Sequence, residues 1–280
     1  MGRISLTAKM IRVLGLYDAA RGEWDKLAYI HGGSAGETCV NGQTTRVVFH
    51  QAGSRFPADA GYFVVIPGDV VPENAEFAAV NSGELLMKLD RGRVLKVVNS
   101  GFAQVSAKVE FWRNIVAGVL TISDRASRGE RADTSGPALS NLIEALGAEI
   151  RYRAVVSDDR DRIAAQLMEW TDRDASPDLI MTTGGTGFSK RDVTPEALID
   201  VGEKIVPGFG ELMRARSMLR TARGCLSRSI AVIRGGTLII AFPGSETAVR
   251  QCFAAVTPSL RHGIAVLNGW DFECGNGQDR

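Results

Sequence analysis

The segment from residue 178 to residue 196 most constrains how this 280-residue chain can fold. An apolar run at residues 178–181 is typical of a short buried strand, and residues 182–187 contain only threonine and glycine. Glycine permits positive φ and a close approach of the backbone to a ligand, and successive free N–H groups form an anion-binding nest. Asp192 follows, and Mg²⁺ commonly bridges a carboxylate and a phosphate. The segment indicates a site for a nucleotide or another phosphorylated ligand.

A plain strand-to-helix turn explains part of the same segment. Thr194 is a candidate N-cap, with Pro195 at the first helical position and Glu196 in the first turn. This alternative does not account for the glycines or for the charged residues that follow them. The loop alone leaves both interpretations open.

The N-terminal part of the chain has the pattern of a β domain. Residues 103–111 alternate strictly between apolar and polar side chains, as in a half-buried strand. Residues 84–89 and 93–98 flank an Asp-Arg-Gly turn, which predicts a hairpin. Frequent turn residues and short runs fit a small antiparallel barrel or sandwich. We therefore predict a β-rich accessory domain over residues 1–112.

From residue 113 onward, strands and helices alternate. A nearly continuous apolar strand is expected over residues 115–123, as in a sheet covered on both faces. The expected helices cover residues 134–146, 158–170, 195–201, 210–220 and 246–267. The alternation predicts an α/β domain over residues 113–268, with an open, mostly parallel sheet and helices on both faces. Residues 269–280 are expected to form a flexible tail.

Polar residues follow the expected strands of this second domain. Ligands of open α/β sheets bind beyond the carboxyl ends of the strands. Four loops should therefore meet at one edge. They carry Asp124, Asp158, the glycine-rich loop with Asp192, and the segment Pro243, Gly244 and Ser245. The topology predicts that hydroxyls, carboxylates and bare backbone lie together there.

Composition excludes several other classes of protein. A net charge of +1 gives no basic field and argues against a nucleic-acid partner. Four cysteines and three histidines show no metal-binding spacing, so a zinc site is not expected. No run has the length of a membrane span, and the N-terminus lacks the features of a signal peptide. A cytoplasmic protein without membrane contact is expected.

Seven short motifs occur in order along the second domain. They are Leu120-Thr-Ile-Ser-Asp-Arg125, Ser135-Gly-Pro137, Thr183-Gly-Gly-Thr-Gly187, Arg191-Asp-Val-Thr-Pro-Glu196, Pro207-Gly-Phe-Gly210, Leu226-Ser-Arg228 and Phe242-Pro-Gly-Ser245. Together they resemble the molybdopterin adenylyltransferase family, of the MogA and gephyrin G-domain type, over about residues 114–268. One such motif is weak, but seven in sequence are specific.

The resemblance implies adenylylation of molybdopterin by Mg-ATP, with release of pyrophosphate, in molybdenum cofactor biosynthesis. It places the essential acids at Asp158 and Asp192, which would hold Mg²⁺ against the triphosphate. The residues it assigns to substrate binding are Asp124, Gly184, Gly185, Thr186, Gly187, Ser227, Pro243, Gly244 and Ser245. It also implies a homotrimer and suggests a metal-insertion enzyme of the same pathway as a partner, but it does not distinguish molybdenum from tungsten.

Structural roles are alternatives for several of these residues. Asp158 can cap the helix expected after it, Asp124 and Asp192 can be turn residues, and Ser227 an ordinary buried hydroxyl. Arg125 and Arg191 are either solvated charges or phosphate contacts.

Two departures from the family pattern also matter. Ser157 stands where the family usually has proline, and the sequence leaves both Asp158 and Asp159 as candidates for the essential acid. Glu246 adds a negative charge near a polyphosphate site. The alternative function is therefore a non-catalytic molybdopterin-binding or scaffold protein of the same fold. A weaker alternative is an unrelated nucleotide hydrolase that shares the loop.

The N-terminal half carries a fainter resemblance. Residues 61–98, with Pro67-Gly-Asp69 and Glu73-Asn74, resemble MOSC domains, which are β-rich and linked to the molybdenum cofactor. No cysteine stands where such a domain would carry sulfur. The resemblance suggests cofactor handoff or an oligomer contact.

Overall fold

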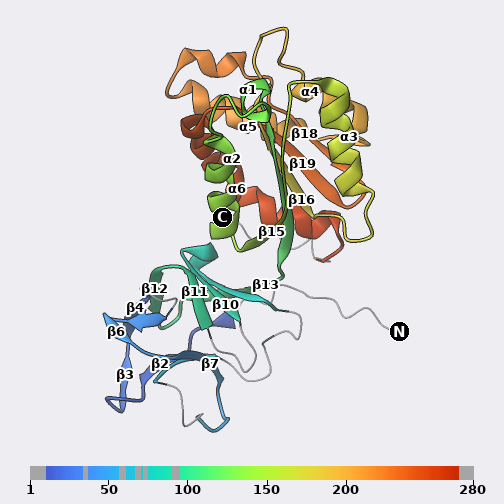
Figure 1. Ribbon diagram of the computed structural model, residues 1–280. Coiled ribbons are helices and arrows are strands. Elements are labelled where there is room, and N and C mark those ends of the chain that lie inside the picture. The colour runs from blue at the N-terminus through green and yellow to red at the C-terminus, as the bar shows by residue number, and fades with distance from the viewer. Residues whose placement is uncertain are drawn as a thin grey trace. The chain divides into compact units, whose positions relative to one another are not determined.

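The computed structural model describes residues 11–33, 37–56, 61–66, 71, 75–89 and 95–270. The chain divides into two compact units, Met1–Asn114 and Ile115–Arg280 (Figure 1). Ten of the residues expected to form a flexible tail, 271–280, lie outside the described residues. Among the described residues, no helix combines the length with the hydrophobicity that a membrane span requires.

The first unit is β-rich, as predicted. Its strands are β1 (Ile11–Arg12), β2 (Gly15–Asp18), β3 (Glu23–Asp25), β4 (Leu27–Gly32), β5 (Thr38–Val40), β6 (Gln43–Thr44), β7 (Val47–Gln51), β8 (Tyr62–Ile66), β9 (Phe77–Val80), β10 (Leu85–Leu89), β11 (Leu95–Asn99), β12 (Gly101–Gln104) and β13 (Lys108–Trp112), with a 3₁₀ turn η1 (Asn81–Gly83). They form three sheets, in the orders β1-β13-β9-β10-β11, β12-β4-β5-β6 and β3-β2-β8-β7. Side chains from all three sheets fill one apolar core.

The predicted hairpin is confirmed, because β10 and β11 pair antiparallel. The prediction of one strand over residues 103–111 is wrong. Ser106 has a φ of 71°, the chain turns between β12 and β13, and Val105 is 39% exposed. The purely antiparallel arrangement is also wrong, because β7 and β8 pair in parallel. Alternation alone does not distinguish one strand from two strands joined by a tight turn.

The residues that carry the MOSC resemblance are largely undescribed. Positions 67–70 and 72–74, which include both quoted motifs, lie outside the described residues. The resemblance therefore stays a prediction.

The second unit is the predicted α/β domain. Its strands are β14 (Ile115–Ile122), β15 (Ala148–Val156), β16 (Leu179–Thr183), β17 (Lys204–Ile205), β18 (Ala231–Arg234) and β19 (Thr237–Phe242). Its helices are α1 (Asp124–Ser127), α2 (Ser135–Ala145), α3 (Arg160–Thr171), α4 (Thr194–Val201), α5 (Pro207–Met218), η2 (Ala222–Leu226) and α6 (Glu246–Leu267). The sheet order is β15-β14-β16-β19-β18-β17, parallel across β15, β14, β16 and β19 and antiparallel at β18 and β17. The prediction of an open, mostly parallel sheet is confirmed.

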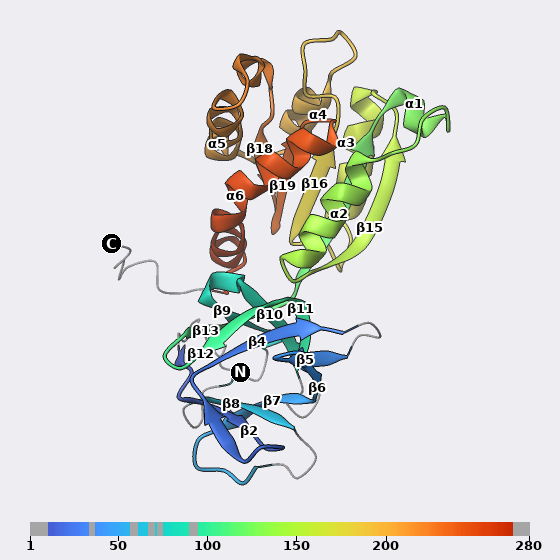
Figure 2. The ribbon, with the colours of Figure 1, turned by 90° about the vertical axis from the view of Figure 1, so that its left-hand side faces the viewer.

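Helices cover both faces of this sheet. Figures 1 and 2 show α2 and α6 on one side and α3 and α4 on the other. Successive residues of β14 alternate between the two cores: Val119 packs with α2 and α6, and Leu120 with α3 and α4. Because the central strands are buried on both faces, their sequence is nearly continuously apolar. Because helices cover both faces of the sheet, the ends of the strands are where a ligand can reach it.

Candidate active site

The loops after four parallel strands meet at one edge of the sheet. The amide of Ser123 donates to the carbonyl of Val156, and the amide of Gly184 donates to the carbonyl of Phe242, at 3.1 Å. A pocket of about 220 Å³ opens between these loops. Its lining includes four predicted site residues, Asp158, Gly184, Gly185 and Gly244.

The glycine-rich loop takes a conformation that other residues rarely adopt. Gly184 and Gly185 have φ values of 106° and 62°. A Cβ on Gly184 would lie 2.1 Å from the carbonyl oxygen of Ile122, and one on Gly185 would lie 2.3 Å from Oγ1 of Thr194. Glycine is therefore required at both positions by the fold, whatever ligand the loop binds.

Thr194 holds the glycine-rich loop rather than capping the following helix. Its hydroxyl donates to the carbonyl of Gly184 at 2.9 Å, and its amide donates to the carbonyl of Gly185 at 3.1 Å. The N-cap of α4 is Val193, which makes no side-chain capping bond. The prediction of Thr194 as the N-cap is wrong, because its fully buried hydroxyl has the nearby carbonyl of Gly184 as a partner.

Asp158 and Asp159, which the sequence does not separate, have different roles. The carboxylate of Asp159 accepts from the amide of Arg162 at 3.0 Å and caps α3. Asp158 instead turns toward the pocket, where its Oδ2 accepts from the amide of Asp124 at 2.7 Å. The amide of Asp158 donates to Oδ1 of Asp124 at 3.1 Å in return. The capping alternative for Asp158 is therefore wrong.

Three carboxylates and one arginine set the electrostatics of this edge. Burial raises the pKa of Asp158, and the negative charges of Asp124 and Asp192 act in the same direction. Arg191 donates to both carboxylate oxygens of Asp124 at 2.8 Å, and these bonds hold the pKa of Asp124 below its usual value. Arg191, a candidate phosphate contact, is thus occupied by a carboxylate on the neighbouring loop.

Asp192 lies beside Gly187, at the end of the glycine-rich loop. Its Oδ2 accepts from the amide of Ser189 at 2.7 Å, and a Cβ on Gly187 would lie 2.9 Å from the same oxygen. Its charge still reaches Asp158. Asp192, Thr186 and Gly187 are therefore beside the pocket but not among the residues that line it.

The segment after β19 supports the glycine-rich loop from the other side. The carbonyl of Pro243 accepts from the hydroxyl of Thr183 at 2.9 Å. A Cβ on Gly244 would lie 3.1 Å from Cα of Gly184, so the two backbones are in close contact. The hydroxyl of Ser245 accepts from the amide of Ala248 and caps α6. Of the three residues, Gly244 is the one that lines the pocket.

Ser227 lies outside the pocket lining, in a short polar network. Its hydroxyl donates to the hydroxyl of Ser229 at 2.9 Å. The guanidinium of Arg214 donates to the carbonyls of Ser227 and Ser229 at 3.3 and 2.8 Å. The next residue, Arg228, joins this segment to the glycine-rich loop through its amide, which donates to the carbonyl of Thr186.

Several residues that the sequence did not single out belong to the site. Asp133 accepts from the hydroxyl of Thr121 at 2.6 Å and from the amide of Gly136 at 2.9 Å, which fixes the start of α2. Arg131 lines the pocket, and within the described residues it makes no ion pair or hydrogen bond. An aspartate three residues before a helical amide is a capping signal that could have indicated Asp133. Nothing local in the sequence indicates Arg131.

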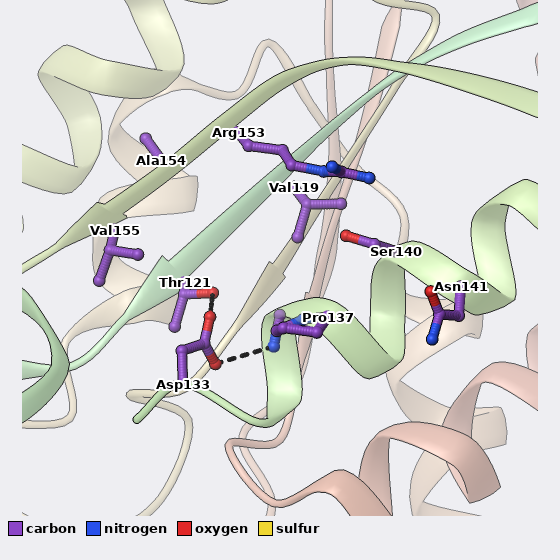
Figure 3. Close-up of a pocket in the computed structure, with 10 residues that line it drawn as sticks. Val119, Thr121, Asp133, Pro137, Ser140, Asn141, Arg153, Ala154 and Val155 are labelled. Atoms are coloured by element: carbon purple, nitrogen blue, oxygen red, sulfur yellow. Dashed lines mark hydrogen bonds between the residues drawn. The ribbon is translucent and has the colours of Figure 1, made fainter. Parts of the chain in front are cut away.

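A second pocket, of about 340 Å³, lies between α2 and the edge strand β15. It shares Thr121 and Asp133 with the first pocket. Figure 3 shows these two side chains facing each other at one end, with Arg153 and Ser140 farther along the groove. Asp133 therefore forms part of the partition between the two hollows.

The carboxylates fit a magnesium ion that is held jointly with a substrate. Among the described residues there is no group of three or more candidate metal ligands. Mg²⁺ usually takes one or two protein carboxylates and completes its shell with phosphate oxygens and water. Oδ1 of Asp158 and Oδ1 of Asp192 accept no hydrogen bond from the described residues. The two aspartates thus offer hard oxygen donors beside the glycine-rich loop, Asp158 next to Gly185 and Asp192 next to Gly187.

The fold and the site define an α/β protein with a polar, glycine-lined pocket at the carboxyl ends of its parallel strands. Residues 118–262 match the family model described as the probable molybdopterin binding domain. The chain belongs to that family.

Comparison with individual proteins agrees with this assignment. A protein of Helicobacter pylori named molybdopterin adenylyltransferase is 41% identical over 159 residues, which are 56% of this chain and 90% of that protein. The crystal structure of the molybdopterin biosynthesis enzyme MoaB from Thermus thermophilus superposes with a TM-score of 0.53 and 38% identity, over 57% of this chain and 99% of that one. The structure of the tungsten cofactor synthesizing protein MoaB from Pyrococcus furiosus gives a TM-score of 0.52 with 30% identity. That match covers 56% of this chain and 98% of the other one.

We predict that Gly184→Ala destabilises the protein, because it combines an unfavourable positive φ with a clash against the carbonyl of Ile122. The expected loss is about 1–3 kcal/mol from the backbone conformation alone. Gly208→Ala, in α5, is the matched control, since a Cβ there would meet no atom within 4 Å. Equilibrium urea unfolding measures both, and equal midpoints for the two variants would contradict the prediction.

Proposed function

We propose that this protein transfers the adenylyl group of ATP to the terminal phosphate of molybdopterin. An oxygen of that phosphate attacks the α-phosphorus of ATP, the bond from the α-phosphorus to the bridging oxygen breaks, and pyrophosphate leaves. The observation that carries the proposal is the pairing of Asp158 with the glycine-lined pocket, with Asp192 close enough for its charge to act on Asp158. The similarity to named adenylyltransferases over this same domain supports it.

The residues of the chain would divide the work between positioning and charge. The backbone of Gly184 and Gly185 lines the pocket, and Arg131, which has no ion pair within the described part of the chain, supplies a cation to the phosphates. Ser227, Thr186 and Gly187 are not among the residues that line the pocket with Arg131, and we assign them to molybdopterin. Phosphoryl-type transfer depends mainly on such positioning and charge neutralisation.

Magnesium would be held by Asp158 and Asp192. When bound, it neutralises the charge that develops on the phosphate oxygens. Burial is the main cause of the raised pKa of Asp158, and the negative charges of Asp124 and Asp192, which a divalent cation would offset, raise it further.

The alternative function is a non-catalytic molybdopterin-binding or scaffold protein. Pyrophosphate release from Mg-ATP, measured with and without molybdopterin, separates the possibilities. Release that requires molybdopterin supports the transferase. Binding of molybdopterin without release would leave the scaffold, and ATP turnover without molybdopterin would indicate a hydrolase.

We predict that Asp158→Asn and Asp192→Asn each lower kcat for pyrophosphate release by about 100-fold or more. A bound divalent ion contributes several kcal/mol to such a step, and 1.36 kcal/mol corresponds to a factor of ten. Asp159→Asn is the control, because asparagine also caps a helix and this side chain faces α3. Comparable losses in all three variants, or wild-type activity in the first two, would refute the assignment.

The pH profile provides a separate test of the Asp124–Arg191 pair. Arg191 lowers the pKa of both Asp124 and Asp158, so Arg191→Gln should raise both values. If turnover requires both carboxylates ionised, the acidic limb of the kcat profile should move to higher pH in the variant. If the acidic limb stays at the wild-type pH, even with a changed maximal kcat, the protonation of neither Asp124 nor Asp158 limits turnover.

An exposed apolar surface beside the site suits the homotrimer that the family resemblance implies. η2 packs on α5, and Arg228, two residues after the end of η2, donates to the carbonyl of Gly187, the residue before Phe188. The members of this surface are Phe188, Met218, Leu219 and Leu226, exposed by 70, 48, 77 and 45%. Patches of this kind on a folded domain mark contact surfaces, and we assign this one to the subunit contact.

We predict that Leu219→Glu dissociates the trimer, because it places a charge in the apolar contact. Val155→Glu, on the edge strand β15 and 44% exposed, should leave the assembly intact. Sedimentation equilibrium gives the mass of each variant. A monomeric wild-type protein, or a trimer in both variants, would contradict the assigned surface.

A further inference from the structure

Arg228 connects three parts of the site that are distant in the sequence. Its Nε donates to the carbonyl of Gly187 at 2.8 Å, and its Nη2 donates to the carbonyl of Asp192 at 2.5 Å. Its Nη1 forms an ion pair with Glu196, in the first turn of α4. One guanidinium therefore binds the chain on both sides of residues 188–191 and ties it to a helix.

The chemistry of these contacts favours arginine specifically. A guanidinium presents its N–H donors in a rigid plane, so three bonds in divergent directions fix the relative positions of three acceptors. An ammonium group carries the same charge but cannot reproduce this geometry. Burial acts to raise the pKa of Glu196, yet the bond from Arg228 holds it below its usual value, so the pair is ionised.

The segment that Arg228 holds is the one that places Asp192. The amide of Ser189 donates to the Asp192 carboxylate, and the amide of Asp192 donates to the carbonyl of Ser189. This turn is internally bonded, so its orientation relative to the pocket depends on what ties it to the rest of the domain, namely the exposed pair of Arg191 with Asp124 and the contacts at the two ends of the turn. The carbonyls of Gly187 and Asp192 are those ends, and both accept from Arg228.

We infer that Arg228 is the positioning residue that sets Asp192 and the end of the glycine-rich loop for magnesium and polyphosphate binding. The inference rests on the proposed adenylyl transfer. Arg228 acts through Asp192 and does not need to touch the substrate. Its loss should affect the magnesium requirement and kcat more than the affinity for molybdopterin.

The test compares Arg228→Lys with Arg234→Lys in the full-length chain. Arg234 is a matched control, since it donates to the hydroxyl of Thr171, the carbonyl of Val201 and the carboxylate of Asp172, away from the site. The two side chains are similarly exposed, 33 and 26%. A purely structural role predicts similar effects from the two substitutions.

Arg228→Lys should lower kcat by about 10- to 100-fold, the range seen when a residue that orients a metal ligand is lost. The Mg²⁺ concentration for half-maximal rate should rise several-fold, with a smaller rise in KM for molybdopterin. Arg234→Lys should leave all three quantities near their wild-type values. Equal kinetic and magnesium constants in both variants, in an active wild-type protein, would overturn the inference.

Two further measurements separate this inference from failure of the proposed function. Binding of Mg-ATP, measured by calorimetry without molybdopterin, should weaken in Arg228→Lys but not in Arg234→Lys, even if the wild type releases no pyrophosphate. If Arg228→Lys fails to fold, Glu196→Gln provides the second variant, because it removes the charge that anchors Arg228 to α4. A wild-type magnesium requirement in that variant would also count against the inference.

Discussion

The parallel register of β14, β16 and β19 is the constraint on which the site depends. Thr121 is level with Thr183, and Thr183 is level with Phe242, so the three strands end together. β15 ends at the same edge, with Val156 opposite Ile122. Because parallel strands that end together release their loops on one side, residues more than a hundred positions apart line one pocket. A shift of one strand would separate Asp158 from Gly184.

Much of this architecture could be predicted from the sequence. Continuous apolar runs identify β14 and β16 as strands covered on both faces, and glycine or proline marks the ends of α2 and α4. The strands of the N-terminal unit are less predictable from the sequence. The alternation at residues 103–111 continues across the turn at Ser106, since residues on both sides of it point into one core. A period of two shows which side chains are buried, and two short strands on either side of a turn can continue the same period.

The details of the site depended on contacts that sequence patterns do not contain. Asp158 and Asp159 are chemically identical, and only the position of the α3 amides decides that Asp159 caps the helix. Thr194 precedes Pro195 as a good N-cap would, but its hydroxyl donates to the carbonyl of Gly184. Arg228 contacts residues 32 to 41 positions away. Such choices are fixed by tertiary packing, after local propensity has set the elements.

The two departures from the family pattern do not remove the features on which transfer would depend. Glu246 lies in the first turn of α6, where the helix dipole favours an acid, and it pairs with Arg250 at 2.9 Å. The ion pair with Arg250 therefore partly neutralises the negative charge that Glu246 adds near the pocket. The carbonyl of Ser157 accepts from the amide of Asp159 at 2.8 Å, a contact that the carbonyl of proline also makes. The turn that orients Asp158 therefore needs no proline. Ser157 and Glu246 change the surroundings of the pocket and leave in place the residues on which transfer would depend.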